Sequence, residues 1–308
     1  MPLIRHEVDS YNDVEIYNPI TGKVRSLSVP QPRLMHIQKT ILAGINTHWI
    51  HHTAGNIPHA YIRHRSILTA AKSHPWAKSG FKLDIKDFFP SISSELIEAN
   101  WTSKKLSSLP RHEKELVSSF ISLATRSRHD DFVDSTYLPQ GAPTSGLMSN
   151  IAARRIDLAM ARVAKRFDLR VTRYSDDILF TSDENVERIS LEAALEMAQG
   201  SITKLGFEIN KTKTRILTPG SRMEVLGVML GGETPRLSRT KRRKIESEIR
   251  GIVKFGLLSH ALERHRNPDA LYQSLRGYLA FAYPLEKEWA GRQIALLQSA
   301  VKDLYASN

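Results

Sequence analysis

Two adjacent carboxylates, Asp176 and Asp177, lie within the segment VTRYSDDILF at residues 171–180. The β-branched, aromatic and apolar residues on both sides predict a tight hairpin with the two acids at its tip. Neighbouring carboxylates repel each other, so they are stable together mainly where a cation binds or where solvent screens them. Mg²⁺ prefers such hard oxygen ligands together with substrate phosphates. A solvated hairpin turn without a ligand is the alternative interpretation.

A third acid, Asp84, lies upstream in the segment FKLDIKDFFP at residues 81–90. Alternation places the apolar residues on one face of a predicted strand and Asp84 in mid-strand on the other face, beside lysines. A mid-strand acid is costly unless it is solvated, paired or bound to metal. We therefore expect Asp84 and Asp176 to bracket two Mg²⁺ ions, at the separation of roughly 3.5–4 Å used for nucleotidyl transfer. An exposed acid that pairs with Lys82 or Lys86 is the alternative.

A third segment, YLPQGAPTSG at residues 137–146, is rich in proline and glycine and predicts a rigid loop. Gly141 permits close backbone approach to a ligand, and the Gln140 amide offers a donor and an acceptor. Thr144 and Ser145 are good candidates to cap a long amphipathic helix over residues 146–167. A plain helix-entry loop is the alternative.

The order and wording of these segments resemble the core motifs of reverse transcriptases, and the bacterial retron type most closely. The three motifs are LDIKDFF at residues 83–89, LPQGAPTS at 138–145 and YSDD at 174–177, and further similar segments lie at residues 24–41, 59–67, 206–214, 225–228 and 275–281. So many matches in the right order make a chance resemblance implausible.

Three residues depart from the usual retron pattern. Ala70 stands where an asparagine is usual, Leu226 replaces a threonine, and Ser175 replaces an alanine. These departures leave polymerisation intact but leave the subgroup open among retron enzymes and their relatives, which include group II intron, diversity-generating and abortive-infection enzymes.

The resemblance implies an α+β fold with the right-hand architecture of polymerases: fingers, a palm of antiparallel sheet plus helices, and a helical thumb. We expect the fingers at residues 1–79 with part of 100–139, the palm at 80–99 and 140–234, and the thumb at 235–308. The pattern predicts a strand at 24–29, helices at 33–48, from Ser93 or Ser94, at 110–128, 146–167 and 185–205, a loop at 126–137, a hairpin at 170–181, short strands near 206–218 and 223–230, a turn at Gly231-Gly232, and helices from 238 to about 305.

The resemblance also assigns roles around the acids. Asp84 and Asp176 would each bind both Mg²⁺ ions, the backbone carbonyl of Ile85 would bind the second ion, and Asp177 would lie nearby with at most transient metal contact. Asp87 would be a structural or hydrogen-bonding acid.

Around the incoming nucleotide, Phe89 would exclude a 2′-hydroxyl by its bulk, with an ordinary core position as the alternative and Phe88 as the more typical core ring. The nucleotide pocket would include Gln140 and Gly141. Arg63 and Arg65 are candidates to hold the triphosphate, since arginine suits bidentate phosphate contact. Either Lys211 or Lys213 would protonate the departing pyrophosphate, although lysines near strand turns are usually just solvated.

The nucleic acid would meet other residues. Leu226 and Gly227 match the primer-grip turn. The segment RTKRRKIESEIR at residues 239–250 predicts a basic helix. Its Lys241, Arg242 and Lys244, with Arg276 further along, would neutralise phosphates, which makes binding depend on salt. A solvated helix face is the alternative.

Composition agrees with a nucleic-acid partner but does not decide it. The 308 residues carry 44 Lys and Arg against 32 Asp and Glu, a net charge of +12, with a sequence pI near 9.8. No cysteine is present, which excludes disulfides and cysteine–zinc sites. The absence of a long apolar run and of a signal-peptide pattern predicts a cytoplasmic protein without a membrane partner. The scattered histidines, among them His51, His52, His59, His64 and His74, are expected to contact nucleic acid or solvent rather than metal.

The leading functional hypothesis is an RNA-directed DNA polymerase that uses dNTPs. Its retron version would extend a 2′-hydroxyl of a cognate structured noncoding RNA and produce a branched, multicopy RNA–DNA molecule. That product would serve antiphage defence with a separately encoded effector protein. The alternatives are an abortive-infection polymerase with untemplated or different primer use, and an RNA-binding scaffold with a vestigial site.

Overall fold

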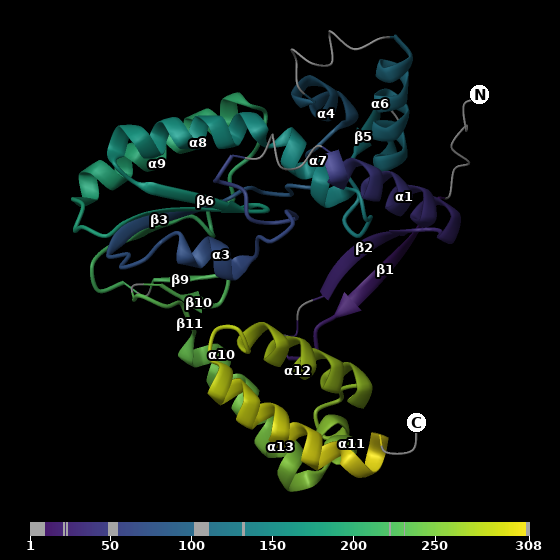
Figure 1. Cartoon of the computed structure of the whole chain (residues 1–308), viewed down its shortest axis with the longest axis vertical. Helices are drawn as coiled ribbons and strands as arrows, with labels where there is room; N and C mark the ends of the chain where they lie inside the picture. The colour runs from purple at the N-terminus through teal and green to yellow at the C-terminus, as the bar shows by residue number, and fades with distance from the viewer. Residues whose placement is uncertain are drawn as a thin grey trace. The chain divides into compact units, whose positions relative to one another are not determined.

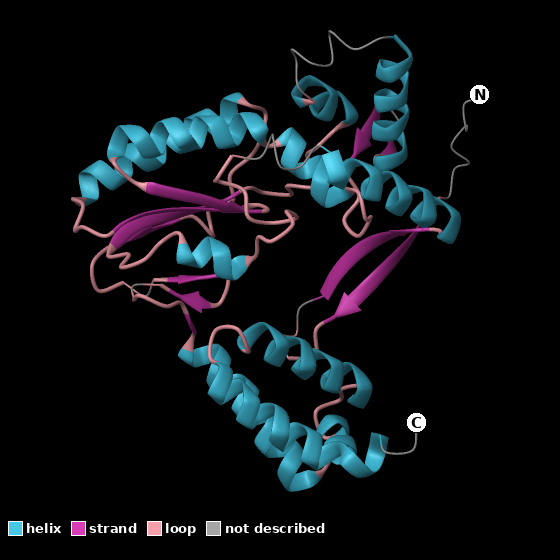
Figure 2. Ribbon diagram, viewed as in Figure 1, coloured by secondary structure: helices cyan, strands magenta, loops and turns pink. Residues whose placement is uncertain are grey.

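The structure is a computed structural model that describes residues 10–48, 55–101, 111–130, 133–221, 223–230 and 232–305, except residues 21 and 23 (Figure 1). The chain divides into two compact units, residues 1–14 with 26–221 and residues 15–25 with 222–308. Helices and antiparallel strands occur in both (Figure 2), which confirms the predicted α+β class.

The first unit is built around one four-stranded antiparallel sheet, in the order β6-β7-β3-β8. Helices α8 and α9 run side by side over one face of this sheet (Figure 1). The strands and helices of the chain up to residue 221 are β1 (Tyr11–Tyr17), β2 (Val24–Pro30), α1 (Pro32–His48), α3 (Ile67–Lys72), β3 (Ser79–Asp84), α4 (Ser94–Asn100), α6 (Arg111–Ala124), β4 (Arg126–Asp130), β5 (Val133–Tyr137), α7 (Ser145–Ala152), α8 (Arg154–Phe167), β6 (Arg170–Tyr174), β7 (Asp177–Ser182), α9 (Arg188–Lys204) and β8 (Arg215–Leu217).

The face of the sheet under α8 and α9 forms the core of this unit. Phe81 and Phe180 are register partners on β3 and β7, and their rings stack with centroids 4.5 Å apart. Leu83 and Ile85 are also buried, as the alternation predicted. Because these apolar residues point into the core, the residues between them must lie on the opposite face.

Several predicted elements are confirmed at these bounds. They are the strand at 24–29, the helix at 33–48, the helix that Ser93 caps, the hairpin at 170–181, the helix within 185–205 and the short strands within 206–218 and 223–230. Gly231 of the predicted glycine turn lies outside the described residues.

Asp84 is the last residue of β3, so the mid-strand position that we predicted is wrong. The next residue, Ile85, forms an isolated bridge with Ile209, and its amide donates to the Asp176 carbonyl at 3.0 Å. The chain then leaves the sheet through turns at 86–91, where Asp87 has a positive φ of 45°. Asp84 therefore lies at the end of the sheet where the chain leaves β3.

The single helix predicted over residues 146–167 is two helices, α7 and α8, which break at Ala153. The predicted side-chain caps are also absent at this helix start. Thr144 already has helical backbone angles (φ −80°, ψ −20°) and makes no capping hydrogen bond, while the Ser145 hydroxyl donates to the Pro139 carbonyl at 2.6 Å. Ser145 therefore fixes the preceding loop instead of capping the helix.

Residues 126–130 and 133–137 form the paired antiparallel strands β4 and β5, so the loop predicted there is wrong, and the helix predicted to reach residue 128 ends at Ala124. Arg126 pairs with Tyr137 and Ser127 with Thr136 across the two strands. Pairing of the backbone holds these polar strands together without an apolar stripe.

The second unit contains a small sheet and a helical bundle. Its elements are β9 (Glu224–Val225), β10 (Val228–Met229), β11 (Arg236–Leu237), α10 (Arg239–Phe255), α11 (Leu257–Leu262), α12 (Pro268–Ala282) and α13 (Lys287–Tyr305). The predicted helices from 238 to about 305 are confirmed, and the Ser238 side chain caps α10. Apolar residues of all four helices form the core, among them Ile249, Leu257, Leu275 and Leu297.

A buried polar network joins α10 to α11 within this unit. Glu248 and His260 are both buried, and the His260 Nε2 lies 3.0 Å from a Glu248 carboxylate oxygen. Arg264 approaches the other ring nitrogen at 2.8 Å, and Arg266 donates to Glu248 at 2.9 Å. The ring packs so closely on α10 that a Cβ at Gly251 would overlap it.

The expectation that His74 contacts nucleic acid or solvent is wrong. His74 is buried, and its two ring nitrogens hydrogen-bond the hydroxyls of Thr181 and Thr172 at 2.6 and 2.8 Å. His59 is also buried and bonds Thr69 at 2.8 Å, whereas His64 is exposed as predicted. The hydroxyls supply partners that water would otherwise provide. His51 and His52 lie outside the described residues.

None of the helices in the described part of the chain has both the length and the hydropathy needed to cross a bilayer.

Candidate active site

The three predicted acids meet at one end of the central sheet. Asp84 at the end of β3 is the register partner of Asp177 at the start of β7, and Asp176 lies in the turn that joins β6 to β7. Ser175, the other turn residue, has a positive φ of 61°, which allows the two-residue turn to match the twist of the strands. The hairpin with acids at its tip is therefore confirmed.

Each of the two paired acids is held by a lysine. Lys213 Nζ donates to both carboxylate oxygens of Asp84, at 3.0 and 2.9 Å. Lys82 Nζ lies 2.6 Å from an oxygen of Asp177. Two carboxylates directly opposite each other in a sheet repel, and these ammonium groups offset the repulsion.

Burial changes the acidity of this cluster. It raises the pKa of Asp176 and of Asp177, and the negative charge of Asp84 raises both further. The hydrogen bond to Asp84 raises the pKa of Lys213. The site therefore holds more negative charge than its surroundings solvate well, and it would be stabilised by a cation.

The donor set suits a divalent ion by its chemistry, because it offers carboxylate oxygens in a desolvated, acidic setting. Within the described ranges, no group of three or more His, Asp or Glu side chains is arranged to hold a metal ion. The residue types fit magnesium. In this structure the positive charge beside the acids comes from the ammonium groups of Lys82 and Lys213.

Arg173 is a supporting residue that the sequence analysis missed. Its side chain is fully buried, its guanidinium makes two bonds of 2.7 and 2.8 Å to Asp157 on α8, and it also donates to Asn150 and to the carbonyl of Ser175. This one side chain fixes the acidic turn to α7 and α8. The strand β6 reads RVTRY, so no local signal distinguishes the buried Arg173 from the exposed Arg170 of the same strand.

Tyr61 is a second missed residue. Its hydroxyl donates to the Ser175 hydroxyl at 3.2 Å, and its ring meets Phe89 edge-on with centroids 6.1 Å apart. A Cβ at Gly146 would approach the same ring to 2.6 Å, so the Tyr61 side chain packs closely against that glycine. Tyr61 thus touches the three segments 81–90, 137–146 and 171–180, and it gives Ser175 a partner that an alanine would lack.

Phe88 is a core ring, as predicted, with 3% of its surface exposed. Phe89 is half-buried and packs against the core from the side, between Phe88 and Tyr61. This position leaves part of the Phe89 ring accessible, as a contact with a nucleotide sugar would require, and its role as a gate stays a prediction.

The two arginines differ in their surroundings. Arg65 donates to the carbonyls of Gly55 and Pro58, both at 2.7 Å, so it supports the local loop. Arg63 is exposed. Of the two predicted triphosphate ligands, Arg63 is thus the one whose guanidinium is not committed to these backbone carbonyls.

The loop with Gln140 and Gly141 is fixed to β2. The Gln140 carbonyl accepts from the Ser28 amide at 2.7 Å, while the Gln140 side chain is exposed. Gly141 has φ +120°, and a Cβ there would lie 3.1 Å from the Ser28 carbonyl oxygen. The close approach that we predicted for a ligand is thus made to the neighbouring strand, and contact of this loop with a nucleotide remains untested.

The two lysines predicted as candidates to protonate the pyrophosphate, Lys211 and Lys213, differ in their contacts. Both side chains are exposed, and Lys213 is the one that pairs with Asp84, at 2.9 Å. The sequence left both open, and the geometry favours Lys213 as the lysine at the site.

In the second unit, Leu226 and Gly227 form the turn between β9 and β10, with φ values of +53° and +82°. Lys241 Nζ donates to the Leu226 carbonyl at 3.2 Å and lies 4.7 Å from the centre of the Phe281 ring. Burial lowers the pKa of Lys241. This lysine therefore supports the turn at residues 226–227 through its hydrogen bond to the Leu226 carbonyl.

Arg242 is likewise engaged. It pairs with Glu286 at 2.9 Å and lies over the Trp289 ring at 5.0 Å. Lys244 is exposed, as is its neighbour Arg243. The phosphate contacts predicted for α10 remain untested, and they fit the exposed pair better than Lys241 and Arg242.

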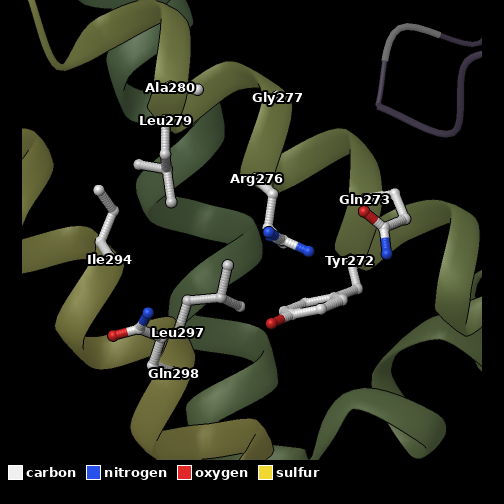
Figure 3. Close-up of a pocket in the computed structure, with 9 residues that line it drawn as sticks. All are labelled: Tyr272, Gln273, Arg276, Gly277, Leu279, Ala280, Ile294, Leu297 and Gln298. Carbon is white, nitrogen blue, oxygen red and sulfur yellow. The ribbon is translucent and has the colours of Figure 1, made fainter. Parts of the chain in front are cut away.

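Arg276 is exposed on α12 and lies over the Tyr272 ring at 5.7 Å. Both side chains line a cavity of about 500 Å³ between α12 and α13 (Figure 3). The remaining lining residues are Gln273, Gly277, Leu279, Ala280, Ile294, Leu297 and Gln298. Arg276 therefore lies at a hollow surface, as a ligand contact would require, and its role stays a prediction.

Comparison with known proteins gives matches over most of the chain. Residues 12–230 match the family described as reverse transcriptase (RNA-dependent DNA polymerase). The retron Mx65 reverse transcriptase of Myxococcus xanthus is 29% identical over 282 residues, which are 88% of this chain and 61% of that protein. The retron Mx162 reverse transcriptase of the same species is 29% identical over 252 residues, 74% of this chain and 50% of that protein. The retron Ec73 reverse transcriptase of Escherichia coli is 26% identical over 275 residues, 86% of this chain and 80% of that protein.

The matches therefore span 61% and 50% of the length of the two Myxococcus proteins.

Proposed function

The chain belongs to the reverse transcriptase family and is of the retron type, and from this premise we propose that it is an RNA-directed DNA polymerase. The observation that carries the proposal is the meeting of Asp84, Asp176 and Asp177 at one end of the central sheet. An intact acidic cluster argues against a scaffold with a vestigial site.

The proposed reaction is attack of a primer hydroxyl oxygen on the α-phosphorus of a dNTP. A bond forms between that oxygen and phosphorus, the hydroxyl loses its proton to water, the bond to the β-phosphate bridging oxygen breaks, and pyrophosphate leaves. Asp84, Asp176 and the Ile85 carbonyl would hold two Mg²⁺ ions, with Asp177 nearby and in at most transient contact with metal; the ions when bound supply a more acidic hydroxyl and stabilise the leaving group's charge.

The protein's own residues would position the nucleotide. Phe89 would limit space beside the 2′-carbon of the sugar, and Gln140 with Gly141 would border the pocket. Arg63 would hold the triphosphate. Lys213 would pass its proton to the leaving pyrophosphate oxygen, which its proximity to Asp84 supports.

The nucleic acid would be gripped by three parts of the chain. We propose fingers at residues 1–79 with part of 100–139, a palm at 80–99 and 140–234, and a thumb at 235–308. The net charge of +12 supports contact with a polyanion. In the thumb, the exposed Arg243 and Lys244 would contact phosphates, and the Leu226–Gly227 turn would meet the primer.

We further propose a cognate structured noncoding RNA as template and primer. Its 2′-hydroxyl would begin synthesis of a branched, multicopy RNA–DNA product in the cytoplasm. That product would act in antiphage defence with a separately encoded effector. The likeness to retron reverse transcriptases supports this finer proposal.

The test is the nucleic acid that copurifies with the protein from its native host. The copurifying DNA and RNA would be sequenced with and without treatment by a debranching enzyme. We expect DNA complementary to one structured RNA, joined to it by a bond that the debranching enzyme removes. The Asp84→Asn protein, purified in parallel, should carry the RNA without the DNA.

Two other outcomes would contradict parts of the proposal. DNA without a template sequence would indicate untemplated synthesis of the abortive-infection kind. RNA alone on the wild-type protein, with no DNA synthesis in vitro on a primed RNA template, would indicate a scaffold.

A further inference from the structure

The two lysines that pair with the acids differ in how far their side chains are exposed to solvent. The Lys82 side chain is 15% exposed and its partner Asp177 is 12% exposed, so this pair is largely enclosed. The Lys213 side chain is 55% exposed, although its partner Asp84 is 4% exposed. One ammonium group is therefore part of the packed sheet, and the other reaches the site from solvent.

Their attachment to the fold differs in the same way. Lys82 lies on β3, where its register partner is Leu179, so its side chain crosses the sheet diagonally to Asp177 on the same face. Lys213 lies in the turn at 211–213 that precedes β8, and its backbone amide bonds Asn210. A side chain on a turn can swing away without disturbing the sheet.

We propose that Lys213 is a displaceable counter-ion that covers the metal-binding oxygens of Asp84 in the metal-free protein, whereas Lys82 is a fixed counter-ion that positions Asp177. This inference rests on the proposed function, because it takes Asp84 to be a metal ligand.

Lys213 and Mg²⁺ would compete for the same carboxylate oxygens of Asp84. Lys213 Nζ bonds both Asp84 oxygens, and Mg²⁺ would need at least one of them. An ammonium group on a flexible four-carbon chain can exchange one anionic partner for another. Triphosphate oxygens are such a partner, so arrival of the nucleotide would draw Lys213 away and expose Asp84. Free divalent ions alone would bind weakly.

The first experiment measures metal affinity without catalysis. The full-length protein, free of nucleic acid and nucleotide, is titrated with Mn²⁺, and free Mn²⁺ is followed by electron paramagnetic resonance. Lys213→Met should bind Mn²⁺ up to about fivefold more tightly than wild type, in proportion to the strength of a partly exposed ion pair, about 1 kcal/mol or less. Lys211→Met is the matched control, because it removes the same charge from the same turn, and its affinity should stay close to that of wild type.

A double variant locates the effect. Adding Asp84→Asn to Lys213→Met should abolish the gain in affinity. If the gain persists, the ion binds elsewhere and the proposal is overturned. Equal affinities for Lys213→Met and Lys211→Met also overturn it, as does failure of Lys213→Met to bind Mn²⁺ at all.

Thermal unfolding gives a second readout that separates the lysines. In chelator, both Lys213→Met and Lys82→Met should melt at a lower temperature than wild type, since each leaves a buried carboxylate unpaired. Added Mn²⁺ should restore the Lys213→Met melting temperature and leave a deficit in Lys82→Met. Full restoration of both variants would contradict the fixed role of Lys82.

Failure of the proposed function is distinguishable from failure of this inference. The first appears as absence of RNA-templated DNA synthesis by the wild-type protein. The second appears as unchanged Mn²⁺ affinity in Lys213→Met while the wild-type protein synthesises DNA.

Discussion

Asp84 and Asp177 are directly opposite each other in the register of β3 and β7, and each carboxylate is paired with a different lysine. Like charges in this position are destabilising in a sheet. The fold therefore maintains an unfavourable pair at the site proposed for chemistry, and Lys82 and Lys213 make it tolerable. Such local conflicts are expected where function rather than stability sets the sequence.

Asp84→Asn and Asp176→Asn should each abolish DNA synthesis on a primed RNA template. Each change removes a metal-ligand charge while side-chain volume is kept. The loss should exceed about a hundredfold, the upper range for residues that merely support a ligand. Circular dichroism and thermal unfolding should show folded protein, with stability changed by about 1 kcal/mol or less, since the lysine partner of Asp84 is exposed. Wild-type synthesis rates in either variant would refute the metal assignment.

Phe89→Ala should admit ribonucleotides, because loss of the half-buried ring opens space beside the sugar. The ratio of kcat/KM for dNTP over rNTP should fall by about tenfold to two-hundredfold, the range for a steric pocket.

Phe88→Ala is the matched control for the ring at position 89. Phe88 is 3% exposed, so its removal should cost about 3–5 kcal/mol of stability and leave the ratio unchanged. An unchanged ratio in Phe89→Ala would show that the Phe89 ring is a core residue and not a gate.

Arg243→Glu with Lys244→Glu should weaken binding of an RNA–DNA duplex. The slope of log Kd against log salt should flatten by about 0.9 for each phosphate no longer neutralised. Both side chains are exposed, so stability should change by about 0.5 kcal/mol or less at each position. Identical salt slopes for variant and wild type would place this helix face away from nucleic acid.

The residues at 241 and 242 should behave differently from this pair. Unlike Arg243 and Lys244, Lys241 is engaged within the protein, through its contacts with Leu226 and Phe281. Lys241→Glu should cost about 1–3 kcal/mol of stability, because it would place a carboxylate in a partly buried site beside a carbonyl oxygen. Urea unfolding measures the difference.

His74 should make the protein sensitive to acid. Burial lowers the pKa of His74 from 6.5 to about 3, so the unfolded chain binds a proton that the folded chain refuses. Its contribution to stability is therefore intact above pH 6.5 and falls as the pH decreases from there toward 3, by at most about 1.4 kcal/mol per pH unit.

His74→Gln removes this proton and should reduce the slope of unfolding free energy against pH between 6.5 and 4. His64→Gln changes an exposed histidine and should leave the slope as it is in wild type. Equal slopes for His74→Gln and wild type would mean that His74 titrates normally in the folded protein.

Arg173→Met should destabilise the first unit by about 3–5 kcal/mol, since it leaves Asp157 partly buried without its partner. Arg173→Met with Asp157→Leu should recover part of this loss, because no unpaired charge then remains. Urea unfolding measures the stability of the two variants. If Arg173→Met alone is as stable as wild type, the buried pair is dispensable.

Motif order and hydrophobic alternation sufficed to predict the acidic hairpin, the strand with Asp84 and the basic helix. These features depend on residues close together in sequence. The strand pair β4 and β5 was missed because the sequence RSRHD of β4 offers no apolar alternation, and the pairing is made by backbone groups. The break at Ala153 was missed because neither glycine nor proline marks it.

The partners of the acids could not be predicted for a different reason. Lys213 is 129 positions from Asp84 in sequence, and Tyr61 is 114 from Ser175. Local patterns carry no information about such pairs, which exist only once β8 and the segment before α3 have docked on the sheet. A lysine near a turn or a tyrosine in a loop looks ordinary until then.

The close packing of His260 against Gly251 limits how this protein can vary. Any side chain at position 251 would push the imidazole out of its place and leave Glu248 with Arg266 as its remaining partner in the network. Conversely, once a smaller residue replaces the histidine, the glycine is no longer required. Positions 248, 251 and 260 should therefore drift together among relatives, as one inherited unit rather than three separate residues.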